Sequence, residues 1–308
     1  MQVIYYDDFG IFRSAVLDIL IHDEIQNNLL IDLITKRRVE NREDWLLATV
    51  GNGSGADLTA IYVKPFDLLL YETGNIRSDV AVNLLANELR RIGCAPPGLM
   101  AERSLALRFA EAFSPTGRFD RYMHITAMKL EAPVKHEKAP GACRTLDIND
   151  MYFAPYWERA FSEDCRTTVF SIQDITERLK TRIAKGTHFI WEDGNPVSQA
   201  VHGRDTPNGA LINGVYTPPH YRGRGYASSV VAELSNSLLE RGKGFCCLFA
   251  DAGNPVSSGL YRKMGYYPIC EMEDIRFTTP GPAGHPLPRE GGYNPRPCGS
   301  PPSTGRGL

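Results

Sequence analysis

Apolar and polar positions follow two different periods along the chain. Residues 245–250 form an uninterrupted apolar run, which is typical of a strand buried on both faces of a sheet. Just before it, residues 225–242 have apolar positions every three or four residues, which predicts an amphipathic helix packed on that sheet. The apolar face of this helix carries Ala227, Val230, Val231, Leu234 and Leu238. Together these patterns favour an α/β (α+β) fold: a mixed, twisted sheet flanked by helices.

The same order of elements is predicted twice. The first half predicts, in order, a helix over 11–39, strands over 45–50, 58–63 and 66–71, a helix over 78–92, a strand over 98–101, a helix over 102–114 and a strand over 120–130. The second half predicts helices near 148–162 and 172–185, strands over 188–192, 197–202 and 210–217, the helix over 225–242, the strand over 245–250, a helix over 255–264 and a strand from Tyr266. This repetition predicts a duplicated α/β unit.

Composition shifts mark the domain boundaries. A polar connector with Pro140 and Gly141 separates a first domain, residues 1–134, from a second domain, residues 143–278. Residues 279–308 are dominated by Gly and Pro and contain few apolar side chains. Such a segment cannot bury enough surface to offset the entropy of ordering it, so we expect a disordered tail.

Composition also limits the function classes. The 308 residues are 43% hydrophobic and 23% charged, with a net charge of −2, which gives no indication of nucleic-acid or membrane-surface binding. There is no apolar run long enough to span a membrane, and Asp7 and Asp8 argue against a signal peptide. Seven cysteines with no CxxC pair indicate thiols in a reducing compartment, so we expect a cytoplasmic protein without a structural metal.

The most informative segment joins the strand over 210–217 to the helix over 225–242. After Thr217 the chain turns through two prolines and reads Arg222-Gly-Arg-Gly225 at the start of the helix. A helix N-terminus presents unpaired backbone N–H groups and the positive end of a dipole, and glycines let a ligand approach them closely. With two arginines added, this segment predicts a cradle for a phosphate, most naturally a pyrophosphate.

Two common nucleotide-binding motifs fit this segment less well. The Gly-Lys-Ser/Thr of a P-loop does not occur here. A dinucleotide-binding fingerprint would need a third glycine where Ser228 stands, and five residues separate the strand from Gly223, although Asp251 could act as the ribose-binding acid. A Rossmann-type NAD(P)-binding protein is therefore a remote alternative, and a solvated basic turn is another.

The motif Arg222-x-x-Gly225-x-Ala227 resembles the acyl-CoA motif of the GCN5-related N-acetyltransferases. The segment from Asn254 to Tyr266, which contains Leu-Tyr-Arg-Lys-Met-Gly-Tyr, is similar to a second motif of that superfamily. The resemblance covers about residues 188–277. The first half looks like a degenerate copy that lacks the Arg-x-x-Gly-x-Ala motif, so we expect it not to bind acyl-CoA.

The resemblance implies a role for each matched position. Backbone groups of the strand end would bind the pantetheine arm, residues 223–227 the pyrophosphate, and Asn254 the cofactor arm. Tyr261 would protonate the departing thiolate, and a backbone donor at Val215 would stabilise the oxyanion. The implied acetyl-CoA-binding residues are Val215, Tyr216, Thr217, Arg222, Gly223, Arg224, Gly225, Tyr226, Ala227 and Asn254. Asn254, followed by Pro255, is also a strong helix N-cap pattern.

The general base is not evident in the sequence. Many relatives carry a glutamate on the strand that here spans 209–217, and this strand has no carboxylate. Glu192, His188 and His202 are open candidates on neighbouring strands, and Asn213 could orient a water that relays the proton.

The resulting hypothesis is an N-acetyltransferase that transfers acetyl from acetyl-CoA directly to an amine in a ternary complex, with no metal. The acceptor would be a small-molecule or peptide amine, and neither nucleic acid nor membrane is expected as a partner. The oligomeric state and the length of the acyl chain are left open. Because the strand carboxylate is missing, a non-catalytic acyl-CoA-binding sensor or scaffold is the alternative.

Overall fold

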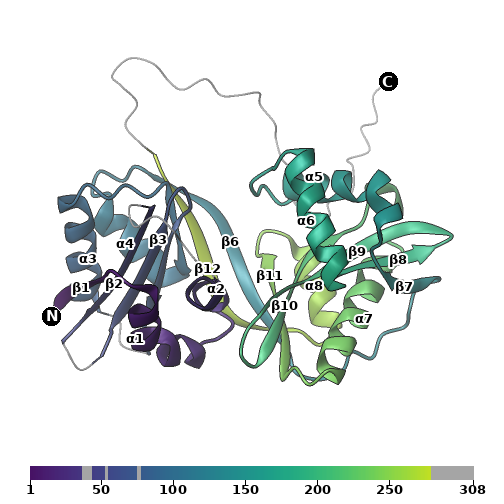
Figure 1. Ribbon diagram of the computed structural model, residues 1–308, viewed down its shortest axis with the longest axis horizontal. Coiled ribbons are helices and arrows are strands. Elements are labelled where there is room, and N and C mark those ends of the chain that lie inside the picture. The colour runs from purple at the N-terminus through teal and green to yellow at the C-terminus, as the bar shows by residue number, and fades with distance from the viewer. Residues whose placement is uncertain (37–43, 53–54, 75–77, 279–308) are drawn as a thin grey trace, which may run out of the picture. The chain divides into compact units, whose positions relative to one another are not determined.

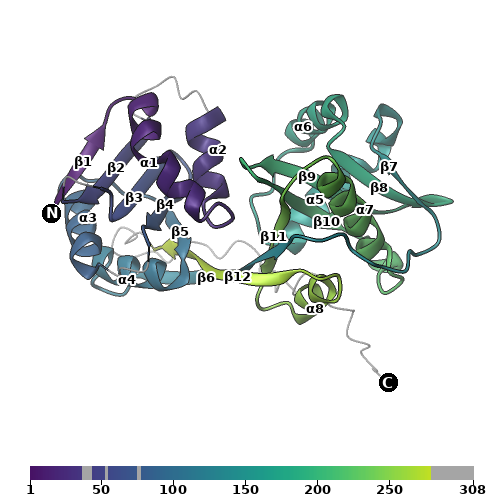
Figure 2. The same ribbon diagram turned by 90° about the horizontal axis from the view of Figure 1, so that it is seen from below.

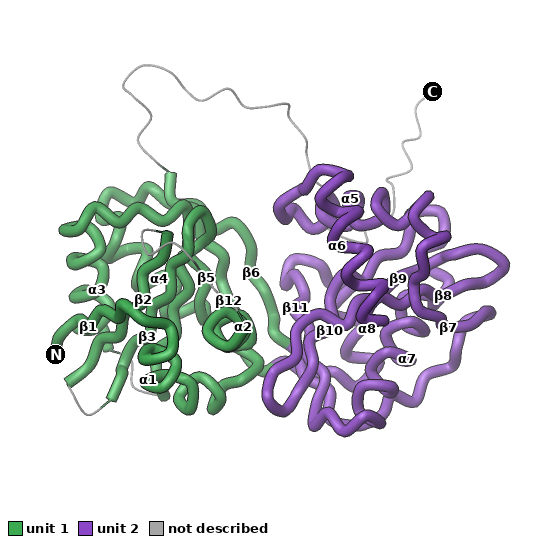
Figure 3. The backbone as a smooth tube through the Cα atoms, viewed as in Figure 1, with its two compact units in different colours: residues 1–127, 269–290 green, residues 128–268, 291–308 purple. Residues whose placement is uncertain are grey.

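The computed structural model describes residues 1–36, 44–52, 55–74 and 78–278. The predicted tail, 279–308, lies outside these residues. Contacts divide the described chain into two compact units (Figure 3): unit 1 contains residues 1–127 and 269–278, and unit 2 contains residues 128–268.

The two halves of the chain, here called the two copies, show the same order of elements. The first copy consists of β1 (Gln2–Tyr6), α1 (Phe9–His22), α2 (Asn28–Lys36), β2 (Trp45–Gly51), β3 (Leu58–Val63), β4 (Leu68–Glu72), α3 (Asp79–Arg91), β5 (Gly98–Glu102), α4 (Arg103–Phe113) and β6 (Phe119–Leu130). The second consists of β7 (Ala142–Thr145), α5 (Ala154–Asp164), α6 (Ile172–Lys185), β8 (His188–Asp193), β9 (Asn195–Asp205), β10 (Gly209–Tyr216), α7 (Tyr226–Glu240), β11 (Phe245–Asp251), α8 (Pro255–Lys263) and β12 (Tyr267–Phe277), with short 3-10 turns η2 (Ile148–Tyr152) and η3 (Pro219–Tyr221). The predicted duplication of the α/β unit is confirmed.

Three local predictions need correction. The helix predicted over 11–39 is divided into α1 and α2, because Asn27 donates to the carbonyl of Leu20 at 3.0 Å and closes a turn between them; residues 37–39 lie outside the described chain. The strands β1 and β7 were not predicted. Both are short strands at the ends of the sheet order, where little apolar periodicity is needed.

In each half of the twelve-strand order, the sixth strand comes from the other copy (Figure 1). In unit 1 the strand order is β1-β2-β3-β4-β5-β12, and residues 272–276 of β12 pair antiparallel with residues 98–102 of β5. In unit 2 the order is β7-β8-β9-β10-β11-β6. The chain enters unit 2 within β6 and returns to unit 1 within β12. The sequence pattern placed 143–278 in one domain, because a local apolar pattern predicts a strand but not its neighbour.

Each sheet is covered by helices on both faces. In unit 1, α1 and α2 pack on one face through Phe12, Val16 and Leu20, and α3 and α4 pack on the other through a core that includes Leu85 and Phe109 (Figure 2). Unit 2 repeats this arrangement, with α5 and α6 on one face and α7 and α8 on the other. None of the helices in the described part of the chain has the length and apolar character that crossing a membrane requires.

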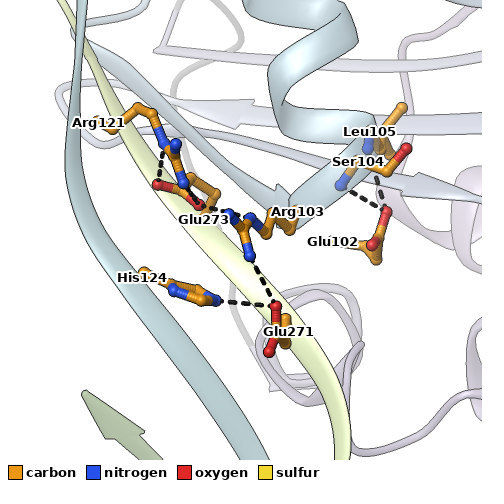
Figure 4. Close-up of polar contacts among 8 residues, drawn as sticks. All are labelled: Glu102, Arg103, Ser104, Leu105, Arg121, His124, Glu271 and Glu273. Atoms are coloured by element: carbon orange, nitrogen blue, oxygen red, sulfur yellow. Dashed lines mark hydrogen bonds and ion pairs between the residues drawn. The ribbon is translucent and has the colours of Figure 1, made fainter. Parts of the chain in front are cut away.

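Ion pairs hold β12 in unit 1 (Figure 4). The carboxylate of Glu273 is 1% exposed and accepts two hydrogen bonds from Arg121, at 2.8 and 2.9 Å. Two residues earlier, Glu271 accepts from Arg103 and contacts His124, both at 3.0 Å. A buried carboxylate is tolerated only when it is paired in this way, so these contacts fix β12 at its position beside β5.

Candidate functional site

The site predicted from the sequence lies at the end of β10 in unit 2. The parallel pairing of β10 with β11 covers only residues 209–211 and 245–247, although β10 continues to Tyr216 and β11 to Asp251. Beyond Leu211 the two strands therefore diverge. Backbone groups along this opening are free of the β10–β11 ladder and can face a ligand, as the resemblance implied for Val215 and Thr217.

A β-bulge shapes β10 next to this opening. Against β9, Asn213 pairs with Val201 and Tyr216 pairs with Gln199, so β10 has one residue more than its neighbour. Gly214 sits in this bulge with φ +60°, a conformation that glycine adopts without strain. The extra residue changes the direction in which the N–H of Val215 can point. This N–H can then donate to a ligand and not to the neighbouring strand.

The N-terminus of α7 is prepared for an anion. Gly225 is its N-cap, with φ +82°, and no side chain caps this end of the helix. Gly223 has φ +79°, and a Cβ placed there would meet nothing within 4 Å. The first N–H groups of a helix have no partner within it, so residues 223–227 offer an open set of donors at the positive end of the helix dipole.

The two arginines of the motif act differently. Arg222 donates from Nε to the carbonyl of Thr217 at 2.9 Å and pairs with Asp164 of α5 at 2.7 Å. Its charge is thus used to fix the turn between β10 and α7. Arg224 is exposed, with its guanidinium 6.0 Å from the ring of Tyr221, and provides the cationic charge that an incoming phosphate would meet.

Asn254 lies at the start of α8, following β11. Its Oδ1 accepts from the N–H of Ser257 at 3.2 Å, which is the N-cap contact expected from the sequence. The side chain is only 2% exposed, and its Nδ2 is buried without a hydrogen-bond partner. A buried donor without a partner is costly, which points to a ligand acceptor at this position.

Tyr261, the predicted proton donor, lies on the buried side of α8. It is 9% exposed and packs edge-to-face on Tyr266 with 5.9 Å between ring centroids.

Asn213 is exposed, and its amide lies against β9, 3.0 Å from where a Cβ of Gly203 would stand. Another of the implied cofactor positions, Tyr226, donates to Asp193 at 2.6 Å and anchors the first turn of α7.

Each of the three open candidates for the base has a partner in the structure. Glu192 pairs with Arg144 at 2.6 Å, and His202 contacts Asp205 at 2.8 Å. His188 is 1% exposed, and burial lowers its pKa to about 4. It contacts Oε1 of Gln199 through Nε2 at 3.2 Å, so this nitrogen carries the proton.

A carboxylate at the bulge was not predicted from the sequence. Glu158 of α5 lies beside Gly214: its Oε1 is 3.7 Å from the position of a Cβ on that glycine. Gln199 joins the two, since its Nε2 donates to Glu158 at 2.9 Å and to the carbonyl of Gly214 at 3.3 Å. The helical pattern near 148–162 predicted the helix, but no local signal indicates that its middle reaches a strand more than fifty residues later.

Unit 1 differs at the equivalent place, where α3 follows β4. The N-cap Ser78 accepts from the N–H of Ala81 at 3.2 Å, and its own N–H donates to the carboxylate of Glu72 at 2.7 Å. Arg108 of α4 pairs with both Glu72 and Asp79. Side chains of unit 1 therefore already occupy the N-terminus of α3.

Unit 1 also contains an open cavity of about 620 Å³ between α4 and the first residues of β12. Both arginines that line it are paired: Arg103 with Glu271, which also lines the cavity, and Arg108 with Glu72, which does not. Glu102 is used to cap α4 through the N–H groups of Ser104 and Leu105 (Figure 4). These contacts make the cavity a structural junction rather than a prepared site.

The described residues contain no candidate metal cluster, and two of their thiols are poorly reactive. No group of three or more His, Cys, Asp or Glu side chains with metal-binding geometry occurs in that part of the chain. Burial raises the pKa of the thiols of Cys143 and Cys246, to about 11 and about 12 respectively, so both are protonated and poorly nucleophilic at neutral pH.

Comparisons with known proteins identify the fold. The family model described as FR47-like protein matches residues 193–275. The structure of a GCN5-related N-acetyltransferase from Sphaerobacter thermophilus is similar over 91% of this chain and 96% of its own, with a TM-score of 0.65 and 16% identity. A GNAT-family acetyltransferase from Colwellia psychrerythraea matches over 90% and 100%, with a TM-score of 0.56 and 9% identity.

A tandem GNAT protein from the clavulanic acid biosynthesis pathway is similar over 92% of this chain and 99% of its own, with a TM-score of 0.53 and 13% identity. A comparison with curated protein sequences gives no match. At these identities the structural similarity shows the fold alone. The chain therefore has the fold of a tandem GCN5-related N-acetyltransferase, as the sequence motifs predicted.

Proposed function

We propose that this protein, with its tandem N-acetyltransferase fold, is an acyl-CoA-dependent N-acyltransferase whose reaction takes place in unit 2. Acetyl-CoA is the proposed co-substrate, and a small-molecule or peptide amine is the proposed acceptor. One observation carries the proposal: the opening between β10 and β11 ends at the uncapped, glycine-bearing N-terminus of α7. This arrangement offers backbone donors to a pantetheine arm and to a pyrophosphate within one unit.

The buried Nδ2 of Asn254 supports the same ligand. It needs an acceptor, and the amide carbonyls of pantetheine are acceptors of suitable chemistry. The exposed guanidinium of Arg224 would add charge attraction for the phosphates. The residues present therefore fit acetyl-CoA as a substrate.

The proposed reaction is a direct transfer. The amine nitrogen attacks the thioester carbonyl, and the N–H of Val215 stabilises the oxyanion because the bulge frees it from the regular ladder. The C–S bond then breaks, and Tyr261 gives a proton to the leaving thiolate. A covalent acyl-cysteine is not required, which agrees with the raised thiol pKa of the half-buried Cys143 and the buried Cys246.

The test is calorimetric titration of acetyl-CoA into the full chain, with NADH as a control, followed by thiol release from acetyl-CoA in the presence of amines. We expect acetyl-CoA to bind, NADH not to bind, and at least one amine to accelerate thiol release. Binding of acetyl-CoA without turnover of any amine would favour the alternative, a sensor or scaffold. Absence of acetyl-CoA binding would refute the proposal.

A further inference from the structure

We propose that Glu158, which lies on a helix and not on the strand, accepts the proton that the amine releases during acyl transfer. The inference rests on the proposed function and concerns the same site. It addresses a specific gap, because β10 (Gly209–Tyr216) has no carboxylate. An amine that attacks a thioester must lose a proton, so a group near the attack position has to receive it.

The position of Glu158 is the first reason for this role. Its Oε1 is 3.7 Å from the Cβ position of Gly214, and Gly214 directly precedes Val215, the proposed oxyanion donor. Glycine at this position leaves room, because a side chain there would also meet Val201 at 2.9 Å. Helix α5 therefore brings a carboxylate to the bulge between Asn213 and Tyr216, one of two places where the pairing of β10 with β9 is irregular.

A buried network fixes this carboxylate. The carboxylate of Glu158 and the carbonyl of Gly214 can only accept, so the amide Nε2 of Gln199 faces both of them and its Oε1 faces Nε2 of His188. Gln199 is fully buried, so its orientation is fixed. One side chain thus ties the bulge and the carboxylate together, which is the kind of support that holds a catalytic group in position.

Glu158 keeps hydrogen-bonding capacity for the reaction. Its Oε1 accepts from Gln199 and its Oε2 accepts from Arg182 at 2.6 Å, but each carboxylate oxygen has a second lone pair. The side chain is 14% exposed, so water can reach it. Arg182 also supplies the counter-charge that a half-buried carboxylate requires.

The neighbouring side chains of α5 support the same location. Trp157 packs against Tyr216 with 6.0 Å between ring centroids, and Asp164 holds Arg222, which in turn holds the carbonyl of Thr217. Contacts on both sides of Glu158 therefore attach α5 to the end of β10. This attachment keeps the carboxylate at a constant distance from the reacting strand.

Atoms and electrons balance in the proposed step. The amine nitrogen forms a bond to the acyl carbon, the C–S bond breaks, and the sulfur takes a proton from Tyr261. The proton lost by the attacking nitrogen passes through a water to Glu158 and from there to solvent. No oxidant, reductant or further co-reactant is needed.

The experiment uses the full chain with acetyl-CoA and a panel of primary amines: 2-phenylethylamine, spermidine, glycine and a short peptide with a free amino terminus. Glu158→Gln should lower kcat by about 100-fold, the usual size of a general-base contribution, while the Kd for acetyl-CoA stays unchanged. For Glu158→Ala, added formate should restore part of the lost turnover by taking the proton itself. Glu163→Gln, an exposed change on the same helix, is the matched control and should leave kcat unchanged.

The outcomes separate the two proposals. If the wild-type protein turns over none of the amines, the proposed function fails and the role of Glu158 fails with it. If the wild type is active and Glu158→Gln retains full kcat, only the role of Glu158 is refuted. Equal losses of kcat and acetyl-CoA affinity without formate rescue would give Glu158 a purely structural role and would also overturn the inference.

Discussion

The N-termini of α3 and α7 occupy the same place in the two copies, yet they carry opposite charges. In unit 1 the helix begins with the capping Ser78 and the acidic Asp79, and Glu72 accepts a hydrogen bond from its first residues. In unit 2 the helix begins at Gly225 without a cap, next to the exposed Arg224. The N-terminus of α3 is therefore already neutralised by carboxylates of the protein, whereas the N-terminus of α7 is free to bind an anionic ligand.

Under the proposed function, this difference separates a structural copy from a binding copy of one fold. In unit 1, Arg108 pairs with Glu72 and Asp79 at the N-terminus of α3, the position equivalent to the N-terminus of α7. The pairing between β3 and β4 is also regular, whereas β10 has a bulge. A pyrophosphate approaching α3 would meet carboxylates, and no bulge would present a backbone donor to a thioester.

The two units also bury different titratable groups. Unit 1 buries Asp274 of β12, where burial raises the pKa of the carboxyl to about 7. Unit 2 buries His188, whose pKa is lowered to about 4. Between pH 4 and 7 the two groups therefore make stability depend on pH in opposite directions. As the pH rises, Asp274 ionises and the free energy of unfolding of unit 1 falls. As the pH falls, the histidine is protonated more readily in the unfolded chain than in the folded one, so the free energy of unfolding of unit 2 falls.

The largest effect is expected from Asp274→Asn. The folded pKa of about 7 lies above the ordinary value of 3.8, so the contribution of Asp274 is favourable at low pH and is lost as the pH rises toward 7. The substitution should therefore raise the free energy of unfolding by up to about 4 kcal/mol at pH 8 and by much less at pH 5. Chemical denaturation at the two pH values measures this. A gain of equal size at both would show that Asp274 is not the titrating group.

Ala227→Asp would place a carboxylate at the N-terminus of α7, as unit 1 has at the N-terminus of α3. A carboxylate in the first turn of α7 repels a pyrophosphate, so the Kd for acetyl-CoA should rise about 100-fold. The same charge favours the helix, so the melting temperature should not fall. Calorimetry and thermal denaturation check the two effects. Unchanged affinity would mean that the phosphates do not lie at this helix end.

Glu72→Gln removes one of the carboxylates that occupy the N-terminus of α3 in unit 1. Glu72 is mostly buried and joins Ser78 to Arg108, so removing its charge should cost about 2 kcal/mol of stability, less than for a fully buried pair. Acetyl-CoA affinity should not change, because the proposed binding site lies in unit 2. Denaturation and titration of the same preparation give both values. A changed affinity would give unit 1 a role in binding.

Asn254→Asp separates capping from ligand binding. Aspartate keeps the acceptor for the N–H of Ser257, so α8 should remain capped. The buried Nδ2 donor is lost, and the Kd for acetyl-CoA should rise about tenfold, as expected for one lost hydrogen bond. Asn254→Ala, which loses both functions, should in addition lower the melting temperature. Normal affinity in the aspartate variant would remove Asn254 from the proposed site.

Much of the fold could be predicted because its signals are local. The apolar period of α7, the continuous run of β11 and the glycines before α7 lie within one short stretch of the sequence. The same local patterns also predicted that the order of helices and strands occurs twice along the chain. The exchange of β6 and β12 could not be predicted, since the alternation of a strand shows which side is buried but not which strand lies beside it.

The candidate site shows the same limit. The motif Arg222-x-x-Gly225-x-Ala227 is contiguous, and the structure places its glycines at the start of α7 as the sequence indicated. However, the sequence could not show that Arg222 turns inward to Thr217 and Asp164, or that Glu158 reaches Gly214 from α5. Both depend on tertiary contacts between segments that are far apart in the chain.

The central claim, that acyl-CoA binds unit 2 and not unit 1, can be tested on the unmodified protein by amide hydrogen exchange with and without acetyl-CoA. We expect protection at residues 215–217 and 223–227 and none at Ser78–Val82, because only the first group lies at an open strand end and an uncapped helix. Protection at the start of α3, or none in unit 2 at saturating acetyl-CoA, would contradict it.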